Sequence, residues 1–188
     1  MFSLKSKNKY KNITPGIYQN IIERSRSKFF YLNLDIEDSF ESRFDIIILH
    51  SFIIFYYLKN SSDNEKKLSQ FLFDFMFEDF DNNLREMGFG DIAVNKKMKV
   101  FITAFYGRIA NYSKGVDQIK NNQENEILNQ AILNNIYKGK NSNTRFLNFF
   151  RKYIIDNLNF FNSRDLKINI TERLRFIEFP LIEQINER

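Results

Sequence analysis

The sequence predicts an all-α protein: a single-domain bundle of about six helices with a buried central helix at about residues 39–59 and an irregular C-terminal tail. The 188 residues include only six Gly and two Pro, too few for the many turns of an all-β sandwich or barrel. Hydrophobic residues make up 43% and charged residues 27% of the chain, which is typical of a globular protein. Apolar residues also recur at helical spacing along most of the chain.

The composition excludes several kinds of chemistry. The chain has no Cys, so it can form neither disulfides nor thiolate metal sites nor cysteine nucleophiles. It has one His, so a multi-histidine metal site cannot form. The net charge of +5 permits attraction to nucleic acid or anionic lipid without requiring either. These counts favour a binding protein over an enzyme, and we expect no metal and no other cofactor.

Residues 1–12 are predicted to be a basic flexible arm, and residues 13–188 a single helical domain. Lysines stand at positions 5, 7, 9 and 11 without an apolar stretch after them, so we expect no secretory signal. The absence of acids before Glu23 leaves a transit peptide open, while the absence of early Arg favours an arm. Such an arm can hold a phosphate backbone or act as a solubilising tail, and we favour the tail.

The first two helices have recognisable starts. Thr14 followed by Pro15 predicts a helix that begins there and continues to about Ser27, and residues 29–36 look extended or irregular. Asp38, with Glu41 three residues later, resembles a capping box for the next helix.

The helix at about 39–59 is the predicted centre of the bundle. Residues 44–58 are apolar almost all round, which is typical of a buried helix or a membrane span. A span needs ~20 apolar residues. This run is shorter and contains Asp45 and His50, which favours a central helix. We interpret His50 as a hydrogen-bonded core residue, because no nucleophile is suitably placed beside it.

A third helix is predicted at about 65–87, with Gly88 as its C-terminal stop. At about 100° per residue, its apolar side chains form an arc roughly 240° wide. The charged residues opposite are best interpreted as a solvated stripe, although they resemble one wall of a carboxylate metal site. They are Asp74, Glu78, Asp81 and Arg85.

Two acids of this helix, Asp79 and Glu86, lie inside the apolar arc and need partners. The next helix is predicted at about 95–112, joined through a short turn, so the two helices should pack antiparallel. Arg108 lies at the edge of its apolar face, and we expect it to pair with one of the two acids.

The rest of the chain predicts two more helices and a tail. They lie at about 123–137 and from Asn143 or Thr144 to about Phe160. Residues 166–170 alternate and could be extended, and Phe179-Pro180 ends regular structure.

One long stretch resembles a known family. Residues 73–91 read FDFMFEDFDNNLREMGFGD, followed by KKMK at 96–99 and AFYGR at 104–108. This string resembles the ubiquinol–cytochrome c chaperone family, whose members carry a similar FDxMFxDMDxxLREMGxGD…AFYGR signature. Four further blocks match: Tyr18 with Arg26, Phe30-Tyr31, Asp38 to His50, and Phe179-Pro180.

The resemblance implies a non-enzymatic assembly chaperone that binds newly synthesised cytochrome b and promotes assembly of ubiquinol–cytochrome c reductase (complex III). It also implies contact with the ribosome and a small partner protein in mitochondrial relatives, and it gives no reason to expect DNA. A bacterial member would act in the cytoplasm, peripherally at the inner membrane, and a eukaryotic one on the matrix side.

We expect the client to bind an exposed apolar patch or groove lined partly by the third helix and the turn at 88–91. The predicted client- or partner-binding residues are Asp74, Phe77, Asp81, Arg85, Phe89, Gly90, Asp91, Lys96, Tyr106 and Arg108. The alternative is a basic helical nucleic-acid- or ribosome-binding module that uses the lysine arm with Lys96, Lys97 and Lys99.

Overall fold

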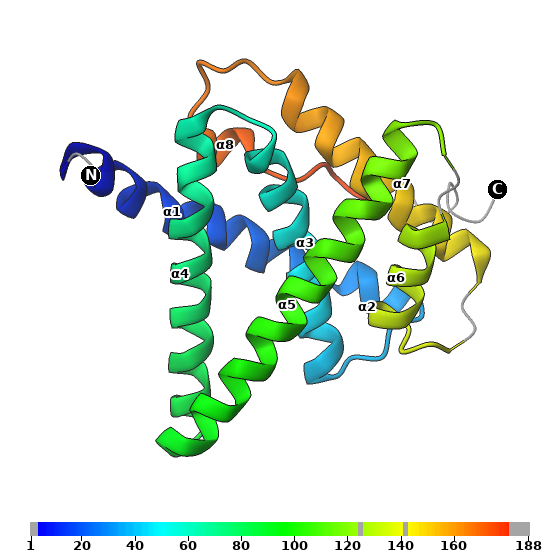
Figure 1. Ribbon diagram of the computed structural model, residues 1–188. Coiled ribbons are helices and arrows are strands. Elements are labelled where there is room, and N and C mark those ends of the chain that lie inside the picture. The colour runs from blue at the N-terminus through cyan, green and yellow to red at the C-terminus, as the bar shows by residue number, and fades with distance from the viewer. Residues whose placement is uncertain (1–3, 124–125, 141–142, 181–188) are drawn as a thin grey trace.

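A buried helix, α3, forms the centre of the structure, and the other helices pack around it (Figure 1). The computed structural model describes residues 4–123, 126–140 and 143–180, in which all regular structure is helical. The helices are α1 (Leu4–Ser25), α2 (Lys28–Asn33), α3 (Phe40–Lys59), α4 (Asp63–Glu86), α5 (Asp91–Lys120), α6 (Glu126–Ile136), α7 (Thr144–Ser163) and α8 (Ile170–Arg173). The all-α fold is confirmed: the long helices correspond to those predicted, and α2 and α8 are short additions.

Helix α3 is central because its side chains are apolar on every side. Thirteen of its twenty residues are buried, and it contacts α1, α4, α5, α6 and α7. Its N-cap is Ser39, whose hydroxyl accepts a hydrogen bond from the Ser42 amide at 3.2 Å, one residue after the predicted Asp38. No helix within the described ranges combines the length and apolarity that crossing a membrane requires.

His50 is a core residue, as predicted. Its ring is fully buried, with Nδ1 2.8 Å from the Ile46 carbonyl and 3.0 Å from the Ser25 hydroxyl. Its Nε2 lies 3.1 Å from the Tyr153 hydroxyl on α7. Burial lowers the pKa of His50 to about 3, because the cationic ring would lose its hydration there. A neutral His50 therefore links α1, α3 and α7.

Helices α4 and α5 form a long hairpin that projects from the bundle (Figure 1). Helix α4 ends at Glu86 with Met87 as its C-cap, and Gly88 follows with φ +86°, a conformation that glycine adopts without steric cost. Gly90 is the N-cap of α5. The two helices diverge from this turn, and α3 lies against both of them.

Helix α1 begins earlier than predicted. It extends back to Leu4, so the expected start at Thr14 is wrong, and Pro15 lies inside the helix. Tyr10 is buried against Phe71 of α4, with ring centroids 5.2 Å apart, which anchors the turn before Pro15. The Thr14 hydroxyl donates to the Tyr10 carbonyl at 2.7 Å instead of capping a helix start. The side chains of residues 4–9, with three of the arm's four lysines, lie outside the described residues.

Two other segments are more helical than predicted. Residues 28–33 form α2, capped by the Ser27 hydroxyl, although the segment was expected to be extended or irregular. Helix α5 continues to Lys120 rather than ending near Tyr112. Gly115 lies inside this extension, where a Cβ would stand 2.6 Å from the Leu128 Cβ. The glycine therefore serves the close approach of α5 and α6 rather than ending the helix.

The segment after α7 is irregular, as expected, yet it is packed. Residues 166–169 form turns rather than the extended segment considered from the sequence, and α8 is a single turn. The Phe179 ring stacks on Phe29 at 4.2 Å between centroids, under the Arg24 guanidinium. The Ile177 amide donates to Asn157 Oδ1 at 3.0 Å. Residues 181–188, which the predicted domain includes, lie outside the described residues.

Candidate functional site

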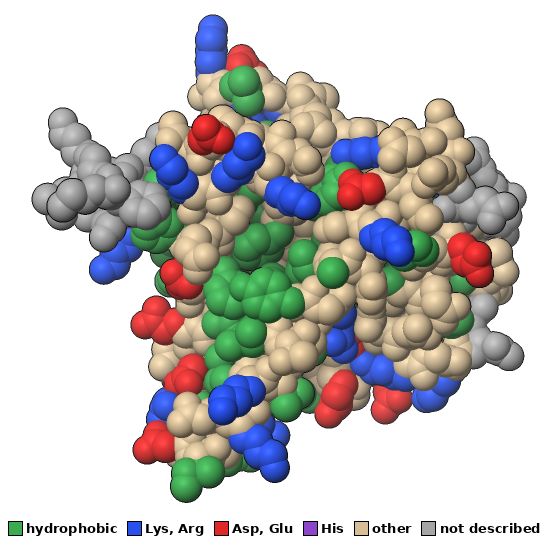
Figure 2. All heavy atoms as spheres, in the orientation of Figure 1, with side chains coloured by type: hydrophobic (Ala, Val, Ile, Leu, Met, Phe, Trp, Pro, Cys, Tyr) green, Lys and Arg blue, Asp and Glu red, His purple; other side chains and the backbone are tan. Residues whose placement is uncertain are grey.

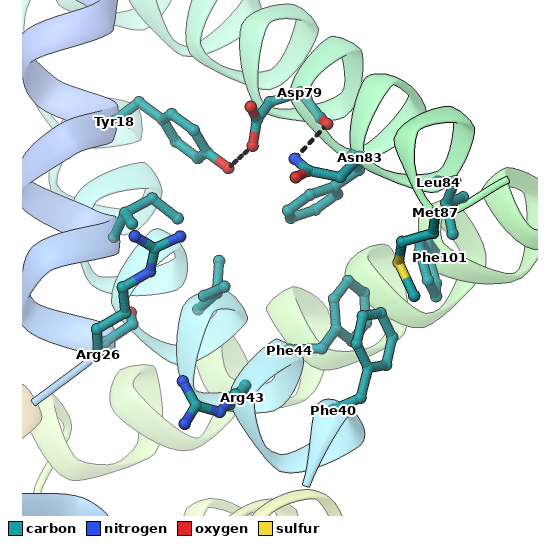
Figure 3. A pocket seen from close by; sticks show the side chains of 14 residues that line it. Tyr18, Arg26, Phe40, Arg43, Phe44, Asp79, Asn83, Leu84, Met87 and Phe101 are labelled. Atoms are coloured by element: carbon teal, nitrogen blue, oxygen red, sulfur yellow. Dashed lines mark hydrogen bonds between the residues drawn. The ribbon is translucent and has the colours of Figure 1, made fainter. Parts of the chain in front are cut away.

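A pocket of about 230 Å³ lies where α1, α3, α4 and α5 converge (Figure 3). Four different helices contribute its walls, so its shape depends on the packing of the whole hairpin against α1 and α3. Ligand pockets for drug-sized molecules typically enclose about 300–1,000 Å³. This smaller volume suits a few side chains of a polypeptide better than a cofactor.

The floor of the pocket is apolar and largely aromatic. Phe44 of α3 lies between Phe80 of α4 and Phe101 of α5, with ring centroids at 5.6 and 4.6 Å. At the mouth, Phe40 is 52% exposed and Met87 is 62% exposed. Exposed apolar side chains beside an aromatic floor are what an interaction site for an apolar partner requires.

One edge of the pocket is a hydrogen-bonded polar group (Figure 3). The Tyr18 hydroxyl of α1 donates to Asp79 Oδ2 of α4 at 2.7 Å. The Asn83 amide donates to the Asp79 backbone carbonyl at 2.7 Å. Burial, together with the neighbouring Asp79 carboxylate, raises the pKa of Tyr18, so the phenol remains the proton donor. Asp79 thereby obtains the partner that its half-buried position requires.

Two guanidinium groups, those of Arg26 and Arg43, also line the pocket (Figure 3). Arg43 donates two hydrogen bonds to Asp38, at 2.7 and 2.8 Å, which raise the pKa of Arg43. Arg26 is exposed and forms no salt bridge with any residue that the structure describes. Arg26 is therefore free to bind a carboxylate or backbone carbonyl of a partner, because guanidinium supplies donors only.

The predicted client-binding residues do not line this pocket. They fall into three places: the end of the α4–α5 hairpin, the region between the two helices, and a half-buried position of α5 against α3. At the hairpin end, Arg85 forms ion pairs with Asp81 and Asp91 and so ties the last turn of α4 to the first turn of α5. The Phe89 ring lies beside Gly90 in the turn, 4.6 Å under the ammonium of Lys97, and Lys96 is exposed.

The second place is an aromatic cluster between α4 and α5, where Figure 2 shows hydrophobic side chains in the hollow between the helices. Tyr106 is 56% exposed, and its ring centroid is 5.5 Å from Phe73. Phe77 is only 6% exposed and packs against Phe73, so its expected place on an exposed groove is wrong. Helices α1, α3 and α5 together cover most of the wide apolar arc of α4. Asp74 is exposed and accepts a hydrogen bond from Gln70.

Arg108 is in the third place, half-buried against α3, and the predicted pair with Asp79 or Glu86 is wrong. Its Nη2 lies 2.7 Å from Asp45 Oδ1 of α3, and Lys138 binds the other oxygen of the same carboxylate. Helical rise explains the error. At about 1.5 Å per residue, Arg108 lies about 25 Å from the turn, whereas Asp79 lies about 10 Å from it.

The sequence did contain a signal for the pocket. Tyr18, Arg26, Arg43 and Phe44 belong to the blocks that carry the family resemblance, and all four line the pocket. Asp79 belongs to the longest block and lines it as well. The predicted site residues all lie in that longest block and the helix after it, and none lies in the earlier blocks. Blocks that are far apart in the chain but meet in space indicate a site more strongly than one long block does.

Comparisons with known proteins agree with the resemblance. The chain is 25% identical to ubiquinol-cytochrome c reductase complex assembly factor 1 of Mus musculus over 182 residues, which cover 95% of this chain and 59% of that protein. It is 26% identical to the Homo sapiens protein of the same name, covering 95% and 58%. The chain thus spans about three-fifths of the length of these curated relatives.

The fold has a counterpart among solved structures. The crystal structure of the Cbp3 homolog from Brucella abortus matches with a TM-score of 0.73 and 25% identity, covering 96% of both chains. The family model described as ubiquinol-cytochrome C chaperone matches residues 32–172. This match spans α3 to α7 and includes Arg43, Phe44 and Asp79 of the pocket. The chain therefore belongs to the ubiquinol–cytochrome c chaperone family.

Proposed function

We propose that this chain is a non-enzymatic chaperone that binds newly synthesised cytochrome b and promotes assembly of ubiquinol–cytochrome c reductase (complex III). Membership of the family, and the names of the mouse and human relatives, support a role in complex III assembly. The four-helix pocket supports binding of a polypeptide client. The chaperone would work where cytochrome b enters the membrane, bound there peripherally.

The pocket is the observation that carries this proposal. It combines an aromatic floor with polar edges, and protein-binding sites have the same division into an apolar centre and a polar rim. An amphipathic or apolar helix binds such a groove by inserting side chains one turn apart. Cytochrome b consists largely of apolar membrane helices, so a segment not yet packed would offer such side chains.

Arg26 gives the pocket a means to position the client. A helix that has not yet packed presents unpaired backbone carbonyls at its C-terminal end. The exposed guanidinium of Arg26 can donate to these carbonyls or to a client carboxylate while the apolar side chains occupy the floor. We therefore propose Arg26, Phe40 and Phe44 as client-contacting residues, in addition to the exposed hairpin residues predicted from the sequence and without the buried Phe77.

The alternative function, a nucleic-acid- or ribosome-binding module, has the exposed lysines of α5 in its favour. Lys96 and Lys99 could neutralise phosphates, and binding of this kind falls steeply as the salt concentration rises. Client capture through an apolar pocket should tolerate salt. Washing at high salt therefore separates the two functions.

The test is co-isolation of cytochrome b with an affinity-tagged full chain from cells that are assembling complex III. Phe40→Asp and Arg26→Glu should lose cytochrome b, because both side chains lie at the pocket mouth and are exposed. The control Leu32→Asp changes a side chain on α2 that is 76% exposed, and this variant should retain cytochrome b. Retention of cytochrome b by both pocket variants, or its absence from the parent protein, would contradict the proposal.

A further inference from the structure

The end of the α4–α5 hairpin carries exposed apolar side chains. Met87, Ile92 and Val100 are 62%, 88% and 60% exposed. Single exposed apolar residues are ordinary on a protein surface, but a group of them at a projecting end is not. In Figure 1 this turn forms the lower end of the molecule, and Figure 2 shows hydrophobic side chains there beside Lys and Arg side chains.

The turn stands clear of the rest of the protein. A Cβ built on Gly88 or Gly90 would meet no atom within 4 Å. The turn is nevertheless fixed in shape, because Arg85 binds Asp81 on α4 and Asp91 on α5. An apolar group that is both exposed and rigidly presented is suited to contact with a surface outside the molecule.

Lysines accompany the apolar side chains. At about 100° per residue, Ile92, Lys96 and Lys99 point within about 60° of one another along α5. Lys96 and Lys99 are exposed and form no salt bridge with the described residues, and Lys97 lies 4.6 Å over the Phe89 ring. A lysine can lay its alkyl stem along apolar surface while its ammonium stays in a polar layer.

The hairpin end has an uncompensated positive charge. Residues 81–100 contain four cationic and three acidic side chains. Two of the acids, Asp81 and Asp91, are engaged by Arg85, which leaves Glu86 as the remaining acid near three lysines. An anionic partner is therefore favoured over a neutral or cationic one.

We propose that the end of the α4–α5 hairpin docks the protein on a bilayer that contains anionic phospholipid. Met87, Phe89 and Ile92 enter the headgroup layer, and Lys96, Lys97 and Lys99 contact lipid phosphates. This pairing of apolar side chains with adjacent lysines is how interfacial segments bind anionic membranes. A nucleic acid would use the lysines, whereas Ile92 and Met87 lack the aromatic face on which single-stranded bases stack.

Docking in this orientation has a consequence for the pocket. Met87 belongs to the hairpin end and also lines the four-helix pocket. A hairpin end resting on the bilayer therefore places the mouth of the pocket close to the membrane surface. The docking proposal does not depend on which client the pocket binds, and its test contains no client.

The test is co-sedimentation of the full chain with vesicles of phosphatidylcholine alone or mixed with phosphatidylglycerol. Binding should require the anionic lipid. Lys96→Gln with Lys99→Gln should weaken binding by about fivefold per lysine. Ile92→Asn should weaken it by roughly tenfold, as expected for an isoleucine that leaves an apolar layer. Lys114→Gln on the same helix and Leu166→Asn, both at exposed positions, should bind like the parent protein.

A fluorescence measurement reports insertion directly. The chain has no Trp, so Ile92→Trp and Leu166→Trp each introduce a single reporter at an exposed position. Brominated phospholipid should quench the fluorescence of the Ile92→Trp variant and leave that of the Leu166→Trp variant unchanged. No binding of the parent protein to anionic vesicles would overturn the proposal. Loss of binding in the lysine variant alone, with Ile92→Asn unaffected and Ile92→Trp unquenched, would also overturn it, because the surface would then be purely electrostatic.

Discussion

The Tyr18 hydroxyl of α1 donates a hydrogen bond to the Asp79 carboxylate of α4 at 2.7 Å, and this contact closes one edge of the four-helix pocket. A carboxylate in an apolar arc suggests a cationic partner, and the sequence suggests Arg108 on the next helix. In the structure the partner is the neutral phenol of Tyr18, which precedes Asp79 by 61 positions in the chain. The pocket therefore depends on the crossing of α1 over α4.

Tyr18→Phe removes this donor and should lower the free energy of unfolding by about 1–2 kcal/mol, because Asp79 is left half-buried without its partner. Urea unfolding followed by far-UV circular dichroism measures the loss. Combining Tyr18→Phe with Asp79→Asn should cost less than the sum of the two single changes. Strictly additive losses would mean that the two side chains do not interact.

Arg108→Met should destabilise the protein by about 2–4 kcal/mol, because the Asp45 carboxylate is 1% exposed and, among the residues that the structure describes, keeps only Lys138 as a cationic partner. Arg85→Met is the matched control, since Arg85 also forms ion pairs, with Asp81 and Asp91, but at the exposed end of the hairpin. The Arg85→Met variant should lose much less free energy of unfolding, as is usual for surface ion pairs. Equal losses in thermal or urea unfolding would contradict the pairing of Arg108 with the buried Asp45 carboxylate.

Stability should depend on pH through His50. Its pKa is about 3 in the folded protein and about 6.5 when the ring is exposed, so between these values only the unfolded state binds the proton. The free energy of unfolding should therefore fall as pH drops below 6.5, by about 1.4 kcal/mol per pH unit from this group.

His50→Gln isolates the contribution of the imidazole. The variant should show a shallower decrease in stability between pH 6.5 and pH 5, measured by urea unfolding at each pH. Because we interpret His50 as a core residue, the folded variant should still support complex III assembly. An unchanged pH slope would contradict the buried neutral ring, and loss of assembly with unchanged stability would assign His50 a functional role.

Two glycines of α5 make a matched pair. Gly115→Ala should destabilise the protein by about 1–3 kcal/mol, because its Cβ would overlap Leu128 of α6, including backbone atoms at 2.8 Å. A Cβ on Gly107 meets nothing within 4 Å, so Gly107→Ala should stabilise the helix by about 1 kcal/mol. Thermal unfolding of both variants measures the difference. A similar effect at the two positions would contradict the close approach of α5 and α6.

The elements with strong local signals were predictable. Helix α3 follows from its all-round apolarity, α4 ends at the predicted glycine turn, and α7 begins after Asn143, whose side chain accepts from the Arg145 amide at 3.0 Å. Errors arose where a distant contact overrides a local signal. The Thr14-Pro15 pair resembles a helix start, yet the burial of Tyr10 on α4 continues the helix through it.

The candidate site was less predictable because it depends on how helices pair. The wide apolar arc of α4 suggested an exposed groove, but α1, α3 and α5 together cover most of it, so Phe77 is buried. The pocket instead takes side chains from four helices whose relative placement no single helix determines. Phe40 gives no indication of a site in the sequence, and Arg26 gives one only through the family resemblance, because each is an ordinary exposed residue until the fold brings them to one mouth.

The most direct test of cytochrome b binding is site-specific photo-crosslinking in cells that are synthesising the respiratory chain. A benzophenone side chain replaces Phe40 at the pocket mouth in one variant and Leu32 on α2 in the other, both exposed in the folded protein. Irradiation should give an adduct that contains cytochrome b from position 40 and none from position 32. Absence of the adduct at position 40, or equal adducts at both positions, would contradict binding of cytochrome b in the pocket.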